Sequence, residues 1–190
     1  MREYTMKRLS HLAVALTALV SVTAPAKADS DFYTENEILN AARGFFGETT
    51  GGLAKAVQKV FSDLGEPNGY ILGEEVGGAF IVGVRYGNGE LSVKNAGKRK
   101  VYWQGPSVGF DFGDNAAKSM TLVYNIKSPD DIFKRSSGVS GSFYFVAGLG
   151  VNYQQAGDVI LAPMRTGVGL RDGANMGYLH YGKENSWIPF

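Results

Sequence analysis

The feature that most constrains the fold is a change of hydrophobic period close to Asn68. Beyond this residue, apolar and aromatic side chains recur at every second position in short runs, as in residues 80–86, 108–112 and 120–124. A period of two is typical of strands that bury one face, because successive side chains point to opposite sides of a sheet. About ten such runs, spaced by roughly 8–12 residues, indicate an all-β sandwich or barrel.

Glycine distinguishes between these two architectures. The chain contains 26 glycines, about twice the usual share, and several stand inside expected strands, among them Gly83, Gly109 and Gly148. Glycine inside a strand marks a sharp bend or a close approach of backbones, and repeated bends let a small sheet close on itself. We therefore expect a mainly β fold, a small antiparallel barrel of about ten strands with two N-terminal amphipathic α-helices. Asn88-Gly89 is expected to form a two-residue hairpin turn, because both positions tolerate positive φ.

Two helices are expected before the alternation begins. Thr34, with Glu37 three residues later, forms a capping box, and the apolar residues that follow share one helical face until Gly47. A second helix, capped by Thr49-Thr50 and ended by Gly65, repeats the same apolar spacing. Both helices have one apolar face, so we expect them to pack outside the barrel or over one end.

The N-terminus has the three parts of a secretory signal. Lys7-Arg8 is basic, Leu12–Val22 is apolar, and Ala26-Lys27-Ala28 offers a cleavage site before Asp29. The apolar run is too short to span a bilayer, which needs ~20 residues. We expect a signal peptide over residues 1–28, with translation starting at Met1 or Met6, and a mature protein in the periplasm.

The expected organisation has three parts, of which the last two form one structural unit: the signal peptide, a helical segment over residues 29–67 and a β-barrel domain over residues 68–190. An integral outer-membrane barrel is the main alternative. Against it, Pro189 stands in what would be the closing strand, and proline cannot donate to that ladder.

Composition excludes several classes of function. With 19 Lys and Arg against 18 Asp and Glu, the chain lacks the basic excess that nucleic-acid binding needs. It has no cysteine, which excludes disulfides, thiolate nucleophiles, zinc–thiolate sites and a lipid-anchor cysteine. Only one of the 2 histidines, His180, lies in the mature part, and one histidine cannot form a histidine-rich metal site. We expect no metal and no cofactor.

One motif matches a catalytic signature in its letters alone. Gly105–Gly109 fits G-x-S-x-G, the nucleophile elbow of hydrolases, which needs a helix directly after the serine. Here an alternating β pattern follows, and His180 is the one candidate base. A hydrolase using Ser107 and His180 is therefore the least favoured alternative, and we expect no enzymatic activity.

A basic and aromatic cluster is the candidate binding site. Its members are Lys94, Lys98, Arg99, Lys100, Tyr102 and Trp103. Cations beside amphipathic aromatic rings suit an anionic headgroup, a phosphate-bearing glycan or an acidic protein partner. The competing interpretation is a charged hairpin tip whose lysines serve only solubility.

The C-terminal half resembles the SYLF lipid-binding domain. The resemblance rests on the Trp-x-x-Pro-Ser segment within Val101–Gly113, the apolar strand Ser119–Asn125, the short helix ending in Asp130–Phe133, and the glycine-rich stretch that follows. It implies lipid binding through an amphipathic helix and basic residues.

The whole mature chain more closely resembles the envelope integrity protein A family of bacteria. The helix Thr34–Gly47, the segment Gly69–Glu75 and the block Gly105–Asn125 carry this resemblance. It implies a soluble periplasmic β-barrel that supports the cell envelope, with no established enzymatic activity. An envelope lipid, glycan or protein is then the expected partner, with peripheral membrane contact.

The first prediction concerns export. Ala28→Asp is expected to block processing, because signal peptidase accepts small residues at the cleavage site. Mass spectrometry of the exported protein should find Asp29 at its N-terminus, and the variant should accumulate at precursor mass. An exported protein that begins at Met1 or Met6 would contradict the assignment.

Overall fold

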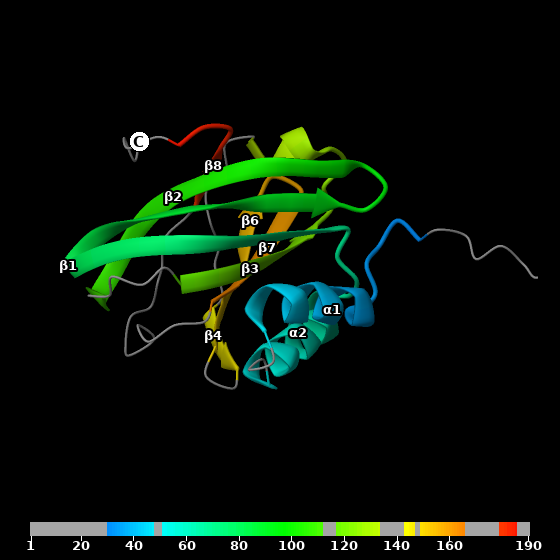
Figure 1. Ribbon diagram of the computed structural model, residues 1–190, viewed down its shortest axis with the longest axis horizontal. Helices are drawn as coiled ribbons and strands as arrows, with labels where there is room; N and C mark the ends of the chain where they lie inside the picture. Colours follow the sequence, from blue (N-terminus) through cyan, green and yellow to red (C-terminus); the bar gives the residue numbers. More distant parts are fainter. Residues whose placement is uncertain are drawn as a thin grey trace, which may run out of the picture.

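The computed structural model describes residues 30–47, 51–111, 117–133, 143–146, 149–165 and 179–185. Its elements are α1 (Glu35–Phe46), α2 (Gly51–Leu64), β1 (Gly69–Val93), β2 (Gly97–Asp111), β3 (Ala117–Tyr124), the 3-10 helix η1 (Pro129–Phe133), β4 (Phe143–Val146), β5 (Leu149–Asn152), β6 (Gln154–Ala156), β7 (Val159–Arg165) and β8 (His180–Gly182). The strands form one curled antiparallel sheet in the order β4-β5-β7-β3-β1-β2-β8, with β6 beside β7 (Figure 1). The expected mainly β, barrel-like class with two helices is confirmed, and the described residues hold 8 strands rather than about ten.

The helix boundaries follow the local signals in the sequence. The backbone N–H of Thr34 donates to Glu37 Oε2 (2.8 Å), and that of Glu37 donates to Thr34 Oγ1 (3.4 Å), which completes the capping box. Gly47 (φ 86°) and Gly65 (φ 78°) end the two helices in backbone conformations that favour glycine. The expected cap Thr49-Thr50 lies outside the described residues.

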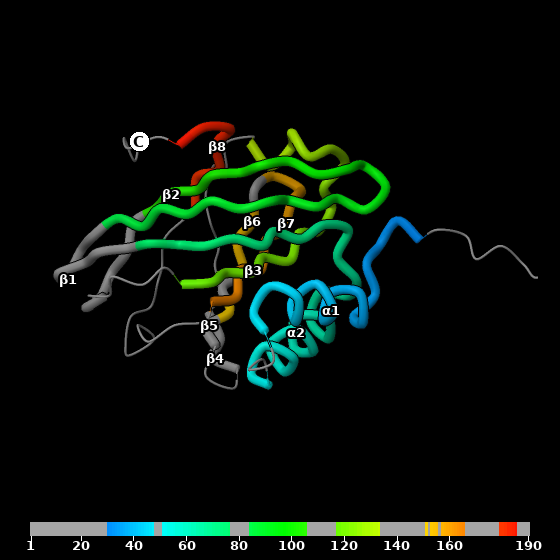
Figure 2. The backbone as a smooth tube through the Cα atoms, viewed as in Figure 1, coloured from blue at the N-terminus to red at the C-terminus, as the bar shows by residue number. Residues whose placement is uncertain are grey.

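The long strand β1 doubles back on itself (Figure 2). Its first limb, Gly69–Glu75, pairs with β3, and its second limb, from Ala79 to Val93, pairs with β2. The limbs lie side by side: the N–H of Lys94 donates to the carbonyl of Asn68 (2.9 Å). Farther along, a Cβ built on Gly73 would lie 2.8 Å from the Cα of Gly89.

The expected turn at Asn88-Gly89 is wrong. Both residues lie within β1, opposite Tyr102 and Val101 of β2. The chain turns after Val93 instead, where Asn95 (φ 58°) and Gly97 (φ 93°) adopt positive φ. Glycine is needed at position 89 because Gly73 packs against it. The sequence does not show whether an Asn-Gly pair serves a turn or a close approach of two backbones.

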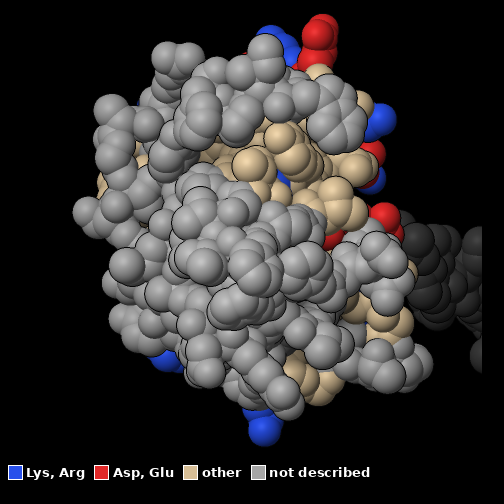
Figure 3. Space-filling model, turned by 90° about the vertical axis from the view of Figure 1, so that its left-hand side faces the viewer, with Lys and Arg blue, Asp and Glu red and all other residues tan. Residues whose placement is uncertain are grey.

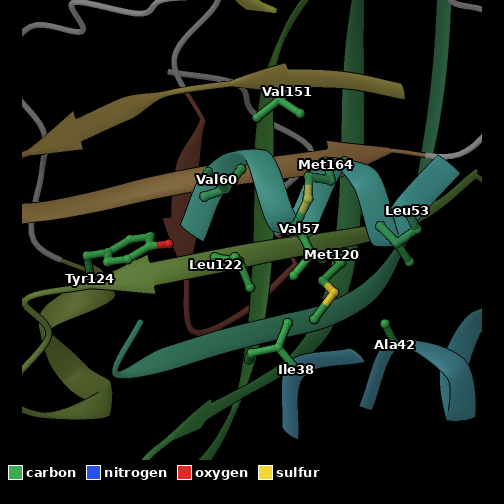
Figure 4. Close-up of a cluster of buried hydrophobic side chains, with 12 residues drawn as sticks. Ile38, Ala42, Leu53, Val57, Val60, Met120, Leu122, Tyr124, Val151 and Met164 are labelled. Carbon is green, nitrogen blue, oxygen red and sulfur yellow. The ribbon is translucent and has the colours of Figure 1, made fainter. Parts of the chain in front are cut away.

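The two faces of the sheet bury two separate cores. On the outer face, Ile38 of α1 and Leu53 and Val57 of α2 pack against side chains of β3 and β7, among them Leu122 and Met164 (Figure 4). The inner core is formed by Ile71, Leu91, Val93, Val101, Trp103, Val123, Ile126, Ile132, Val159, Leu161, Leu179 and Tyr181. Helices α1 and α2 therefore cover the outside of the barrel-like sheet, and side chains of the strands, of η1 and of the adjoining segments fill its interior.

The indole ring of Trp103 packs on glycines from both limbs of β1. A Cβ added to Gly73 would collide with the carbonyl of Asn88 and with the Trp103 ring, and a Cβ on Gly87 would collide with the same ring. Trp103 is 4% exposed. The glycines thus remove the side chains that would otherwise occupy the volume of the indole.

The second prediction tests the packing of Trp103 on these glycines. Gly73→Ala is expected to lower the free energy of unfolding by about 1–3 kcal/mol, the range for overpacking a filled core. Gly44→Ala is the control, because no atom lies within 4 Å of its added Cβ on the exposed side of α1. The free energy of unfolding of Gly44→Ala should equal or exceed that of the wild type, since alanine favours helix by up to ~1 kcal/mol over glycine. Urea unfolding followed by circular dichroism measures the stability of both variants. Equal effects of the two substitutions would contradict the close packing of Trp103 on Gly73.

Candidate functional site

The β1–β2 hairpin exposes most of the expected basic cluster. Lys98, Arg99 and Lys100 lie in β2 and are exposed. Lys98 and Lys100 lie on the same face of the strand as Tyr102, and Arg99 lies on the opposite face, toward η1. Lys98 Nζ lies 2.6 Å from Glu90 Oε1, and Arg99 Nη2 lies 3.4 Å from Asp130 Oδ2. The ammonium group of Lys100 lies 5.3 Å from the ring centre of Tyr102. Exposed ion pairs of this kind contribute about 0–1 kcal/mol each, so they leave these cations available to other anions.

Lys94 has a different role from the other three cations. Its side chain is only 15% exposed, its Nζ lies 2.6 Å from Glu37 Oε1, and it lies 4.8 Å from the ring centre of Tyr33. The hydrogen bond from Lys94, followed by that from the Thr34 backbone, lowers the pKa of Glu37 to about 2. Lys94 therefore ties the hairpin to the start of α1.

Lys183 adds a cation that the sequence did not place at this site. Gly182, its neighbour in β8, pairs with Tyr102 of β2. Lys183 Nζ lies 3.4 Å from Asp130 Oδ1 and 5.4 Å from the ring centre of Phe133. We call Lys98, Arg99, Lys100 and Lys183 the basic ridge. With Glu90 and Asp130 beside it, the ridge has a net charge of +2 (4 − 2).

The structure does not bring Trp103 to the ridge. Tyr102 and Trp103 are consecutive in β2, so their side chains lie on opposite faces of the sheet. Trp103 points into the interior, where its Nε1 donates to Glu75 Oε2 (2.8 Å). Its ring centre lies 6.1 Å from that of Tyr181.

Trp103 leads to a second group of polar residues inside the sheet. We call this group the interior charged cluster: Glu75, Arg85, Trp103, Thr121, Arg165 and Tyr181. The strand pairings place the cluster in one row across β7, β3, β1, β2 and β8. Arg165 of β7 lies opposite Ser119 of β3, which lies opposite Gly73 of β1. Gly87 of β1 lies opposite Trp103 of β2, which lies opposite Tyr181 of β8.

Direct contacts hold this cluster together. Arg165 Nε lies 3.2 Å from Glu75 Oε1, although the two are not aligned for a hydrogen bond. Tyr181 and Thr121, which belong to strands far apart in the sheet order, interact: burial raises the pKa of the Tyr181 hydroxyl, and Thr121 opposes this larger effect by lowering it. Such a contact across the interior is possible because the sheet is strongly curled.

Burial makes the charges of this cluster costly. Arg85 is 2% exposed and Glu75 is 8% exposed. Burial, followed by repulsion from Arg165, lowers the pKa of Arg85 to about 10, while Glu75 acts in the opposite direction. Burial raises the pKa of Tyr181 to about 12. At neutral pH Arg85 is therefore charged and Tyr181 is neutral.

The sequence pattern contained one signal for this cluster. Arg85 stands among apolar residues in an alternating run, which in a barrel is a position for a polar interior. Glu75 and Arg165 gave no such signal, because their proximity depends on the pairing of β1 and β7 with β3.

The hydrolase motif is not in the backbone setting that it requires. Gly105–Gly109 runs within β2 and pairs with β1, so the described backbone has neither the sharp turn nor the helix of a nucleophile elbow there. Among the described residues, no group of three or more His, Asp or Glu could hold a metal ion. Within the same part of the chain, no helix is long and apolar enough to cross a membrane.

Comparison with known proteins gives a family and a solved relative. The family model described as envelope integrity protein A matches residues 31–190. A crystal structure of a beta-barrel-like, uncharacterised protein from Brucella abortus is 47% identical in sequence and has a TM-score of 0.74. That match covers 85% of this chain and 100% of the other. The search of curated proteins gave no match. None of these findings bears on the SYLF resemblance, which stays an expectation.

The third prediction tests the Lys94 tie. Lys94→Met is expected to lower the free energy of unfolding at pH 7 by about 0.5–1 kcal/mol, discounted because Glu37 is largely exposed. Folding lowers the pKa of Glu37 from 4.5 to about 2, so this stabilisation is complete above pH 4.5 and is lost as the pH falls through 2.

Urea titrations at pH 7 and at pH 2 measure the difference between the variant and the wild type. Lys98→Met is the control, because it removes a lysine from an exposed ion pair. It should leave the free energy of unfolding unchanged at both pH values. A loss in Lys94→Met that stays constant down to pH 2 would contradict the tie to Glu37.

Proposed function

The chain belongs to the envelope integrity protein A family, and from this premise we propose that it is an exported, non-catalytic protein of the periplasm. It supports the cell envelope by attaching, through the basic ridge, to an envelope component that carries negative charge. An anionic lipid surface is the occupant that the chemistry of the ridge favours. A phosphate-bearing glycan is the second candidate.

The observation that carries the proposal is the exposure of the ridge cations. The side chains of Lys98, Arg99 and Lys183 are 65%, 48% and 64% exposed. The carboxylates beside them are also open to water, with Glu90 at 56% and Asp130 at 49%. Lysines near an anionic membrane surface contribute about 1 kcal/mol each, so four cations together can hold the protein at a membrane where one could not.

The position of the helices favours peripheral attachment over insertion. A membrane-spanning barrel needs an apolar band on its outer face. In this protein α1 and α2 pack on the outer face of β3 and β7, over residues such as Leu122 and Met164. An integral barrel would have to expose this face to lipid, so we keep that alternative behind the peripheral one.

The fourth prediction tests the ridge by charge reversal. The double variant Lys98→Glu, Lys100→Glu is expected to bind phosphatidylglycerol vesicles at least tenfold more weakly at low salt, because two attractions become two repulsions. Binding of the wild type should itself fall as salt rises, since exposed charges are screened beyond ~10 Å at 0.1 M. Vesicle co-sedimentation measures both effects.

The matched control is Arg43→Glu, Lys55→Glu, which makes the same change in net charge on the exposed surfaces of α1 and α2. It should bind like the wild type. If the wild type binds lipopolysaccharide but not the vesicles, the partner of the basic ridge is a glycan rather than a lipid surface. Binding of the wild type to neither, or equal loss in both double variants, would overturn the proposal.

A further inference from the structure

We propose that Phe32 inserts into the apolar layer of an anionic lipid bilayer, next to the cations of the basic ridge. Phe32 stands two residues before Thr34, the N-cap of α1. The inference rests on the function proposed for the ridge and deepens it, because it assigns the partner as a lipid surface and adds an apolar contact to the electrostatic one.

Phe32 presents an apolar ring to water. It is 46% exposed, and among the described residues Val76, at 53%, is the other large hydrophobic residue in this state. Burying such a ring gains free energy roughly in proportion to the area that is removed from water. Single exposed apolar side chains are common on protein surfaces, so the surroundings of Phe32 decide whether its exposure has a use.

Hydrogen bonds hold the chain on both sides of Phe32. The N–H of Tyr33 donates to the carbonyl of Pro67 (2.8 Å), and Asn95 Nδ2 donates to Asp31 Oδ1 (3.1 Å). Asn95 belongs to the turn between β1 and β2, and Figure 1 shows the N-terminal segment at the same end of the molecule as this turn. The ring is therefore presented from a fixed backbone, which reduces the entropy lost on binding.

Two further aromatic rings connect Phe32 with the sheet. The ring of Tyr33 lies 5.0 Å from that of Tyr70 in an edge-to-face arrangement. Both tyrosines are only partly buried, and their amphipathic rings suit a boundary between an apolar layer and water. We call Phe32, Tyr33 and Tyr70 the aromatic patch.

The aromatic patch meets the basic ridge on one face of the sheet. The N–H of Lys94 donates to the carbonyl of Asn68 (2.9 Å), and this antiparallel pairing places Tyr70, two residues beyond Asn68, opposite Ser92. Ser92 in turn pairs with Lys98. Residues that lie opposite one another share a face of the sheet, so Tyr70, Ser92 and Lys98 form one row. The patch and the ridge are continuous through Lys98.

The carboxylates near Phe32 make its insertion depend on the ridge. Glu37 Oε1 lies 2.6 Å from Lys94 Nζ, whereas the side chain of Asp31 has a neutral partner, Asn95. An anionic surface repels a carboxylate without a cationic partner, and the cations of the ridge offset this repulsion. We therefore expect Phe32 to insert only where the ridge also binds.

An apolar ring beside exposed cations matches a bilayer better than a glycan. Protein segments that lie in the membrane interface combine Phe, Trp or Leu with Lys and Arg, because the cations meet the headgroups while the apolar side chains enter the acyl boundary. A phosphate-bearing glycan offers negative charge but no apolar layer, so it would leave Phe32 in water.

Val76 provides a matched control within the chain. It is more exposed than Phe32, but it lies six residues beyond Tyr70 in β1, roughly 20 Å away at ~3.3 Å per residue. Figure 3 looks onto that end of the molecule, where the visible Lys and Arg atoms of the described residues lie apart from one another rather than in one group.

A tryptophan at either position reports on insertion. In a Trp187→Phe background, Phe32→Trp and Val76→Trp are each mixed with phosphatidylglycerol vesicles whose acyl chains carry bromine, which quenches indole emission on contact. Trp103 is 4% exposed and adds a constant signal. We expect quenching and a blue shift for Phe32→Trp and neither for Val76→Trp. Vesicle binding with quenching in both variants, or in neither, would overturn the inference.

Affinity separates the apolar contact from the electrostatic one. Phe32→Ser is expected to weaken binding to phosphatidylglycerol vesicles about tenfold, and by a similar factor at low and at physiological salt, because burial of a ring is not screened. Phe32→Leu should keep most of the affinity, and Val76→Ser should bind like the wild type. The charge reversal Lys98→Glu, Lys100→Glu should instead have a smaller effect as the salt concentration rises.

The outcomes distinguish this inference from the function proposed for the ridge. If the charge reversal weakens vesicle binding and Phe32→Ser does not, the inference is overturned and the ridge keeps its function. If Phe32→Ser weakens binding and the charge reversal does not, the insertion of Phe32 stands and the function proposed for the ridge is overturned. If the wild type binds lipopolysaccharide but not the vesicles, the ridge has a glycan partner and the insertion is overturned.

Discussion

The contact on which the rest of the structure depends is that of the Trp103 indole with the glycines of β1. Its ring occupies the space above Gly73 and Gly87, which belong to the two limbs of a strand that doubles back. Its Nε1 also holds Glu75 at 2.8 Å. One side chain of β2 thereby fixes the spacing of both β1 limbs and the orientation of the carboxylate that meets Arg165. Because interiors are close-packed, a change in any of these residues must move the others.

The sheet separates two tasks by facing two ways. Its outer face carries Leu122 and Met164 against the helices, a purely apolar contact whose role is stability. Its inner face is apolar in one part and charged in another, where Arg85 and Glu75 are buried. Buried charges add little to stability even when paired, so this part of the inner face depends on the contacts that Glu75 makes with Trp103 and Arg165.

The ridge and the interior cluster also differ in the physics of attraction. Lys98 and Lys183 act through water, where attraction is long-ranged at low salt but weak at contact. Arg85 and the pair of Arg165 with Glu75 lie in a buried setting, where electrostatic interactions are stronger and are screened less by salt.

The sequence by itself determined the local structure: the capping box of Thr34 and Glu37, the helix ends at Gly47 and Gly65, and the mainly β class. These follow from interactions between residues that are close along the chain. Tertiary structure decided everything that depends on strand pairing. Asn88-Gly89 lies in mid-strand, Trp103 faces inward although its neighbour Tyr102 does not, and Lys183 and Arg165 join groups whose other members are remote in the sequence. The period of two shows that a residue alternates between faces, but only the register shows which face is inside and which charges meet there.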